Sequence, residues 1–201
     1  MDLLILFWNY QGVSSLEFQR AFNSLISSYK ADIVAVLEPK VSGLKAVKFI
    51  KTSGFHRSHR VEADNFSGGI WILWNNGFNV DIVINHKQFV HFKVTNMIGV
   101  WSWVTAVYAS PINVVRMQLW IELEKMSNYI KGPWLLGGDF NSILHDEEKK
   151  GGSPKNRGAC RYFSRWFHNA KMIDLKFKGL RFTWSRGLLS KRLDREICND
   201  E

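Results

Sequence analysis

The sequence predicts an α/β fold in which two β-sheets pack together and helices cover the outer faces. Units of strand, helix and strand occur near the beginning and again in the later part of the chain, and five strands without helices lie between them. With 201 residues, 46% of them hydrophobic and 22% charged, the chain is long enough to bury a sizeable core in one domain. We therefore expect a single α/β sandwich.

The first unit has two apolar strands separated by a helix. Residues 3–8 form an apolar run, and Ser14 or Ser15 can cap a helix whose apolar side chains recur at helical spacing between residues 18 and 29. The β-branched run 32–37 predicts a buried strand that ends at Glu38 and Pro39. A second helix is expected over 44–51.

The middle of the chain reads as strands alone. We expect them at 55–61, 69–74, 78–84, 89–95 and 100–109. Asn75-Asn76-Gly77 predicts a hairpin turn, and residues 96–99 predict another.

The last part returns to alternating elements. A helix is expected over 112–131, a short buried strand over 134–136, a polar loop over 146–156 and a helix over 159–171. Short strands should follow at 172–175, 180–184 and 193–198.

Two glycines, Gly137 and Gly138, are expected to break the strand at 134–136, and a carboxylate and an amide follow them. If the chain stays extended there, Asp139 and Asn141 point to one face, because strand side chains alternate. A Gly-Gly turn with an Asx-capped loop explains the same pattern without any function.

Three polar residues, Asn9, Glu38 and Asp139, each follow a buried apolar run. Ligands of α/β sheets bind beyond the carboxyl ends of strands, so these residues form a plausible hydrolytic set with a metal ion. The alternative is that polar residues simply end strands.

The net charge of +9 is concentrated in the last quarter of the chain. Residues 1–148 carry 13 basic and 13 acidic residues, whereas residues 149–201 carry 14 and 5. Such a surface favours a polyanion, and nucleic acid fits better than a membrane because no basic amphipathic helix stands out. Arg157, Arg161 and Arg165 recur every four residues and could hold a phosphate backbone, or they could form only a solvated face.

We expect neither a secretion signal nor a membrane span. The apolar run at 3–8 is too short for a signal peptide or a membrane span, and Cys160 and Cys198 form no metal or disulfide motif. We expect an intracellular protein, nuclear or cytoplasmic, that is monomeric.

Six short motifs, in this order, resemble those of the endonuclease/exonuclease/phosphatase superfamily. The likeness is strongest to the apurinic-type endonuclease domain of plant non-LTR (LINE-type) retrotransposons. The motifs are Trp8-Asn9-Tyr10-Gln11-Gly12, Glu38-Pro39-Lys40, Val107-Tyr108-Ala109-Ser110-Pro111, Gly137-Gly138-Asp139-Phe140-Asn141, Phe182-Thr183-Trp184-Ser185 and Arg192-Leu193-Asp194-Arg195.

The resemblance implies a four-layer α/β sandwich that cuts phosphodiesters of DNA, or of RNA, with one divalent metal, Mg²⁺ or else Mn²⁺. It implies that Glu38 and Asn9 hold the metal and that Asp139 and Asn141 activate and position the attacking water. Magnesium commonly takes only one or two protein carboxylates, which agrees with this set. It also implies that Tyr108 and Thr183 contact the scissile phosphate and that Asp194 orients a histidine. Trp184, beside Thr183, and Arg192 are further expected nucleic-acid contacts.

The sequence departs from the family pattern at one point. The family's histidine lies in a Ser-Asp-His motif on a later strand, and no histidine follows Asp194 here. We therefore expect an incomplete domain with weak or no activity and an open, aggregation-prone sheet edge after residues 193–198. The alternatives are a non-catalytic nucleic-acid-binding remnant and a phosphatase acting on small phosphoesters.

Overall fold

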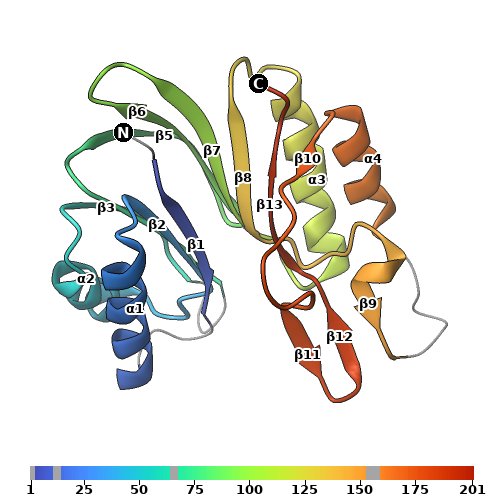
Figure 1. The fold of residues 1–201 in the computed structure, drawn as a ribbon, viewed down its shortest axis with the longest axis horizontal. Helices are drawn as coiled ribbons and strands as arrows, with labels where there is room; N and C mark the ends of the chain where they lie inside the picture. Colours follow the sequence, from blue (N-terminus) through green and yellow to red (C-terminus); the bar gives the residue numbers. More distant parts are fainter. Residues whose placement is uncertain (1–2, 11–14, 64–67, 153–158) are drawn as a thin grey trace.

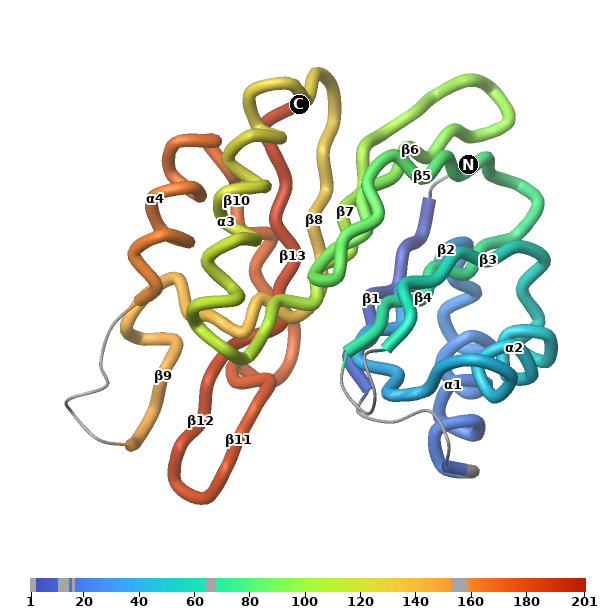
Figure 2. The backbone as a smooth tube through the Cα atoms, turned by 180° about the vertical axis from the view of Figure 1, so that it is seen from behind, coloured from blue at the N-terminus to red at the C-terminus, as the bar shows by residue number. Residues whose placement is uncertain are grey.

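The computed structural model describes residues 3–10, 15–63, 68–152 and 159–201. Two β-sheets face each other, and two helices cover the outer face of each sheet (Figures 1 and 2). This arrangement confirms the predicted four-layer α/β sandwich. None of the helices in the described ranges has the length and apolar character needed to cross a membrane.

The first sheet has the strand order β1-β2-β4-β3, with β1 (Ile5–Asn9) parallel to β2 (Ile33–Leu37). β4 (Ile70–Trp74) runs antiparallel to both β2 and β3 (Arg57–Val61). The helices α1 (Leu16–Tyr29) and α2 (Gly43–Thr52) pack on its outer face. Ser15, one of the two predicted candidates, caps α1: its hydroxyl accepts a hydrogen bond from the Phe18 amide at 3.1 Å.

The second sheet has the order β10-β13-β8-β7-β6-β5. The helices α3 and α4 cover the outer face of this second sheet. A separate three-stranded sheet lies beside it. The elements after β4 are β5 (Phe78–His86), β6 (Phe89–Asn96), β7 (Trp101–Tyr108), α3 (Asn113–Ser127), β8 (Trp134–Asp139), the 3₁₀ turn η1 (Asp146–Glu148), β9 (Lys149–Lys150), α4 (Arg161–Asn169), β10 (Ile173–Asp174), β11 (Trp184–Arg186), β12 (Leu189–Lys191) and β13 (Asp194–Cys198).

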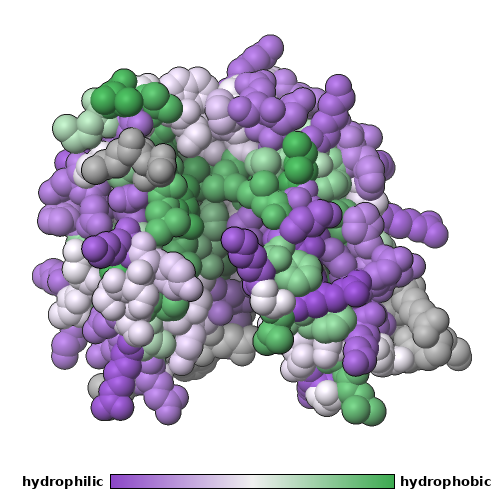
Figure 3. Space-filling model, viewed as in Figure 1, coloured by the Kyte–Doolittle hydropathy of each residue, from purple (hydrophilic) through white to green (hydrophobic). Residues whose placement is uncertain are grey.

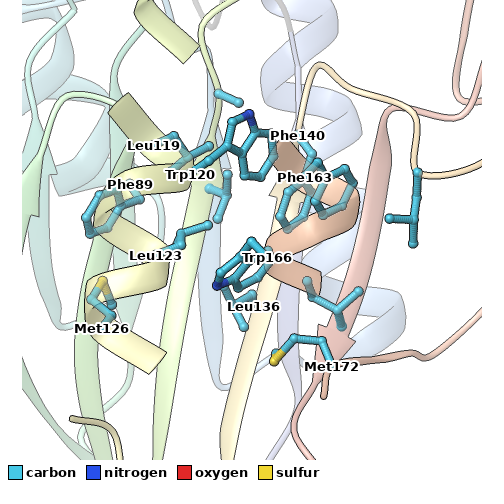
Figure 4. Close-up of a cluster of buried hydrophobic side chains, with 14 of the residues drawn as sticks. Phe89, Leu119, Trp120, Leu123, Met126, Leu136, Phe140, Phe163, Trp166 and Met172 are labelled. Atoms are coloured by element: carbon cyan, nitrogen blue, oxygen red, sulfur yellow. The ribbon is translucent and has the colours of Figure 1, made fainter. Parts of the chain in front are cut away.

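Aromatic side chains fill the space between α3, α4 and the second sheet (Figure 4). The rings of Trp120 and Phe163 stack with centroids 4.6 Å apart, and Phe140 stacks on Phe163 at 5.3 Å. Because Phe140 follows Asp139 directly, this packing anchors the end of β8.

The predicted hairpin at Asn75-Asn76-Gly77 is wrong. β4 pairs with β2 and β3, whereas β5 pairs with β6, so this turn carries the chain from one sheet to the other. The hairpin turn at 96–99 is confirmed, since the Asn96 amide donates to the Val100 carbonyl across the antiparallel β6 and β7.

The expected break at Gly137 and Gly138 is also wrong, because β8 continues through both to Asp139. A Cβ atom on Gly137 would lie 2.3 Å from a ring carbon of Phe7, and one on Gly138 would lie 2.2 Å from the Val107 carbonyl oxygen. The glycines therefore permit close approach of β8 to β1 and β7.

Several boundaries differ at the C-terminal end. α3 ends at Ser127 instead of 131, and the expected polar loop contains η1 and β9, with its residues 153–156 lying outside the described ranges. Residues 180–183 are not a strand, and the chain instead forms the hairpin β11–β12. β13 is not an open edge along its whole length, because β10 pairs with Ile197 and Cys198.

Candidate active site

Strand register brings polar side chains together at one end of the sandwich. Tyr108 on β7 lies beside Asp139 on the parallel β8, and Asp194 on the antiparallel β13 lies on the other side of Asp139. In the facing sheet, Asn9 ends β1 beside Leu37, the residue before Glu38. The carboxyl ends of four strands and the start of a fifth therefore meet at the same end (Figure 1).

A cleft of about 610 Å³ opens at this end. In the space-filling view the two halves of the molecule are separated by a hollow that opens between α1 and the β11–β12 hairpin (Figure 3). The lining residues are Asn9, Glu38, Tyr108, Pro111, Arg116, Asp139, Asn141, Thr183, Trp184, Lys191, Leu193 and Asp194. Eight of the predicted site residues thus share one cavity.

Asn9 connects the two carboxylates of the second sheet. Its Nδ2 donates to Asp139 Oδ2 at 2.9 Å and to Asp194 Oδ1 at 3.0 Å. This arrangement fixes the amide orientation. Asn9 Oδ1, which is buried, has no hydrogen-bond partner among the described residues. An unpaired buried acceptor is costly, so this oxygen is suited to a cation or another donor.

Asn141 orients Asp139 through a left-handed turn. The condition that the chain stays extended at this point is not met, because Asn141 has φ +45°. In this conformation its amide N–H donates to Asp139 Oδ1 at 2.7 Å, and its Nδ2 donates to Asp139 Oδ2 at 3.0 Å and to the Ala109 carbonyl at 2.8 Å. Both residues therefore line the cleft although they are not on one strand face.

Glu38 enters the cleft from the other sheet in a similar way. It also has a left-handed backbone, with φ +54°, and its exposed fraction is 9%. The Lys40 ammonium lies 3.1 Å from its Oε1. Positive φ in residues other than glycine concentrates at functional sites, and here it turns the carboxylate across the end of β2.

Burial changes the protonation of the cleft residues. Burial, followed by the charge of Asp194, raises the pKa of the Asp139 carboxyl to about 7, although hydrogen bonds from Asn141 and Asn9 oppose this. Burial also raises the pKa of Asp194, whose backbone amide donates to the Thr183 hydroxyl at 3.0 Å. Burial and the charge of Glu38 raise the pKa of Tyr108, so its hydroxyl stays protonated.

The residues present fit a divalent metal ion with oxygen ligands. The Glu38 carboxylate and the buried Asn9 Oδ1 are hard oxygen donors, and Mg²⁺ needs few protein ligands because it keeps several waters. No cluster of three or more His, Cys, Asp or Glu side chains that could hold a metal is found within the described ranges.

The remaining residues predicted to contact nucleic acid do not lie together. Trp184 lines the cleft, and Arg161 lines a neighbouring cavity. Arg157 lies outside the described residues. Arg192 requires a correction: it is 6% exposed and both of its terminal nitrogens pair with Asp174 at 2.8 Å, so it does not face the cleft.

Two cations in the cleft were not predicted from the sequence. Arg116 reaches it from α3, and Lys191 reaches it from β12. The only signal was that Lys191 precedes the last motif and that Arg116 lies one turn into the helix after Pro111. None of the six histidines, all of which are described, lines the cleft.

The family can be identified from the sequence as well as from this arrangement. The model of the Endonuclease/Exonuclease/phosphatase family matches residues 6–195. The chain belongs to the endonuclease/exonuclease/phosphatase family. As the name of the family states, its members are endonucleases, exonucleases and phosphatases, which hydrolyse phosphoester bonds, and its nucleases generally depend on a divalent metal. No curated protein matches this sequence at a significant level.

Solved structures of nucleases share the fold. The endonuclease domain of TRAS1, a telomere-specific non-LTR retrotransposon, is similar with a TM-score of 0.70 and 13% identity, covering 98% of this chain and 85% of its own. The 3′ phosphatase NExo from Neisseria, bound to a product DNA hairpin, has a TM-score of 0.69 and 16% identity, covering 99% and 87%. The AP endonuclease LMAP from Leishmania major has a TM-score of 0.71 and 12% identity, covering 98% and 79%. At these identities the likeness establishes the fold.

Proposed function

We propose that this member of the endonuclease/exonuclease/phosphatase family is a retroelement-derived endonuclease that nicks DNA with Mg²⁺ or Mn²⁺. The observation that carries the proposal is the pair of carboxylates, Asp139 and Asp194, joined by the Asn9 amide in a cleft that also holds Glu38. RNA is the second candidate substrate.

Glu38 and Asn9 would hold the metal ion. When bound, a divalent metal polarises a phosphoryl oxygen and stabilises the charge that develops on it. The two ligands come from neighbouring parallel strands of the first sheet, so their spacing is set by the β1–β2 register. Asn9 has a second role, because its Nδ2 restrains both Asp139 and Asp194.

Asp139 would take the proton of the attacking water. A pKa near 7 leaves a large fraction of this carboxyl ionised at neutral pH while making it a better base than an ordinary aspartate. The two donors from Asn141 fix the carboxylate plane. The protonated Tyr108 hydroxyl can donate to a non-bridging phosphate oxygen, and Thr183 and Arg116 lie in the same cleft.

We expect the activity of this chain to be weak. Asp194 lies in the cleft with no imidazole to orient, because none of the histidines lines it. Loss of one positioned proton-transfer or charge-stabilising group typically lowers a rate by about 10²–10⁴-fold.

A nicking assay on supercoiled plasmid tests the proposal. We expect slow conversion to the relaxed form with MgCl₂, none with excess EDTA, and a loss of about 10²-fold or more in Asp139→Asn and Glu38→Gln. Asp81→Asn removes an exposed carboxylate on β5 and is the matched control. Nicking that persists equally in Asp139→Asn would refute the role of this site, and salt-dependent DNA binding without nicking would instead support the non-catalytic remnant.

A further inference from the structure

A second cavity of about 360 Å³ adjoins the cleft. Arg116, Asn141, Lys191 and Leu193 line both, so the two hollows are adjacent. The second cavity is bounded by the first residues of α3 and α4 and by β9 and β12. None of the proposed metal ligands lines it.

The second cavity differs from the cleft in its charge. Four cationic side chains line it, and no aspartate or glutamate is among its described lining residues; the cations are Arg116, Lys149, Arg161 and Lys191. Burial, followed by the charges of Lys149 and Arg116, lowers the pKa of the Lys191 ammonium. Like charges held this close favour an anion between them.

Two helices direct their N-termini at the same space. Asn113 begins α3, Arg161 begins α4, and both residues line the cavity. Neither N-cap residue, Ile112 or Cys160, makes a side-chain capping hydrogen bond. Their first backbone N–H groups therefore add partial positive charge to the cavity.

Two unpaired polar atoms provide an independent indication of a ligand. Ser142 lines the cavity with an exposed fraction of 5%, and its hydroxyl has no hydrogen-bond partner among the described residues. The Nε of Arg116 is likewise buried without a partner. Buried polar groups without partners are rare, and here they border a cationic cavity.

From these observations we propose that the second cavity binds a backbone phosphate of the nucleic-acid strand whose scissile phosphate lies in the cleft. The inference rests on the proposed function, because the position of this cavity next to the cleft is what selects a strand phosphate over a free phosphate ion. Arg161, Lys191, Arg116 and the Ser142 hydroxyl supply donors from several sides, which suits the tetrahedral phosphate group. The site orients the strand across the cleft without reading its sequence.

Arg161 and Arg165 offer a matched pair of substitutions. Both are exposed residues of α4, but only Arg161 lines the cavity, whereas Arg165 pairs with Glu124 at 3.6 Å. Binding of a short fluorescent single-stranded DNA would be measured by anisotropy in EDTA over a series of salt concentrations. We expect Arg161→Gln to lower the slope of log affinity against log salt by about 0.7, the value of one phosphate contact on a single strand, and Arg165→Gln to leave it unchanged.

Ser142→Ala separates ligand binding from folding. Its hydroxyl makes no hydrogen bond within the described part of the chain, so its removal should not lower the thermal midpoint, yet DNA affinity should fall by roughly threefold to tenfold. Equal slopes for Arg161→Gln, Arg165→Gln and the unsubstituted protein, or full DNA affinity in Ser142→Ala, would overturn the proposal.

A neutral methylphosphonate linkage identifies the source of the phosphate. At one position in the strand, a methylphosphonate linkage should lower the DNA affinity of the unsubstituted protein. The same linkage should not lower the affinity of Arg161→Gln any further. Two results together would show a free-anion site and overturn the assignment to a strand. Inorganic phosphate would compete equally with DNA for the unsubstituted protein and for Arg161→Gln, and no methylphosphonate position would weaken binding. Because binding is measured in EDTA, this result is independent of nicking. Failure of Asp139-dependent cleavage would refute the proposed function. A lower salt slope for Arg161→Gln would still support the phosphate site.

Discussion

A buried group of four charges beneath the cleft should be the most sensitive point of the fold. Arg195 is 1% exposed, and its guanidinium donates to Glu148 Oε1 at 3.0 Å, Glu148 Oε2 at 2.6 Å and Asp174 Oδ2 at 3.2 Å. Arg192 pairs with the same Asp174. The four charges balance, and together they tie β13 to η1 and β10.

Arg195→Met should destabilise the protein by about 3–5 kcal/mol, because it leaves a buried carboxylate without its main partner. Burial works against ionisation of Glu148, and the hydrogen bonds from Arg195 outweigh it, so that the pKa of Glu148 lies below its usual value. With an unfolding entropy of about 2.1 cal/mol/K per residue, a chain of this length has about 0.4 kcal/mol/K. The expected fall in the thermal midpoint is therefore about 7–12 °C.

Thermal unfolding followed by circular dichroism measures this change. Arg165→Met is the control, because its partner Glu124 lies 3.6 Å away at the exposed surface, where a pair contributes about 0–1 kcal/mol. Replacing Arg195 and Glu148 together by apolar residues should recover part of the loss, since the Arg192–Asp174 pair stays balanced. A midpoint for Arg195→Met within about 2 °C of the parent would refute this account of the cluster.

Three further predictions concern the sheet, pH and catalysis. Gly138→Ala should lower the free energy of unfolding by about 1–3 kcal/mol in denaturant titrations, because Gly138 has φ +130° and an added Cβ atom would clash with Val107. Gly77→Ala places its Cβ atom in open space and should be nearly neutral. Burial lowers the pKa of His91 to about 4, so the native state resists its protonation. Up to about 3 kcal/mol of stability should therefore be lost as pH falls from 6.5 to 4. In unfolding titrations, the stability of His91→Gln should depend less on pH over this range. Free imidazole should accelerate plasmid nicking by the parent chain but not by Asp194→Ala, and equal acceleration of both would contradict the idea that an imidazole acts beside Asp194.

Much of the sandwich could be predicted because its signals are local. The β-branched run 33–37 forms a strand with every residue buried, and the helical spacing around Phe18 and Phe22 identifies the buried face of α1. Asn9, Glu38 and Asp139 could be selected because each follows an apolar run, and parallel pairing carries such residues to one end of a sheet.

The errors arose where the cause lies in a distant part of the chain. Nothing near Gly137 shows that Phe7 will pack against it, and nothing near Asn75 shows that β4 and β5 will belong to different sheets. The burial of Arg192 depends on Asp174, which reaches it only after β10 pairs with β13. Arg116 is likewise placed by packing of α3, not by its own sequence context.

We expect β1 to be an edge prone to aggregation, in addition to the edge predicted after residues 193–198. The other edge strands of the two large sheets are protected: β3 carries Arg57 and Arg60, apolar residues of β5 alternate with polar ones, and β10 has two residues. β1 has the sequence Ile-Leu-Phe-Trp-Asn, carries no charge, pairs only with β2 among the described strands and is half-buried along its length. Leu4, which precedes it and is 43% exposed, offers a position for a protecting charge.

Leu4→Lys should therefore reduce concentration-dependent association while leaving the thermal midpoint nearly unchanged, since an exposed surface substitution usually alters stability by about 0.5 kcal/mol or less. Light scattering over a concentration series measures the association. Val83→Lys is the matched control, because Val83 is 55% exposed and lies on β5, an edge strand of the second sheet. A parent chain that stays monomeric at high concentration, or equal protection by both lysines, would contradict the role of β1. The same edge carries Asn9, which joins Asp139 and Asp194, so association through β1 should also compete with occupation of the cleft.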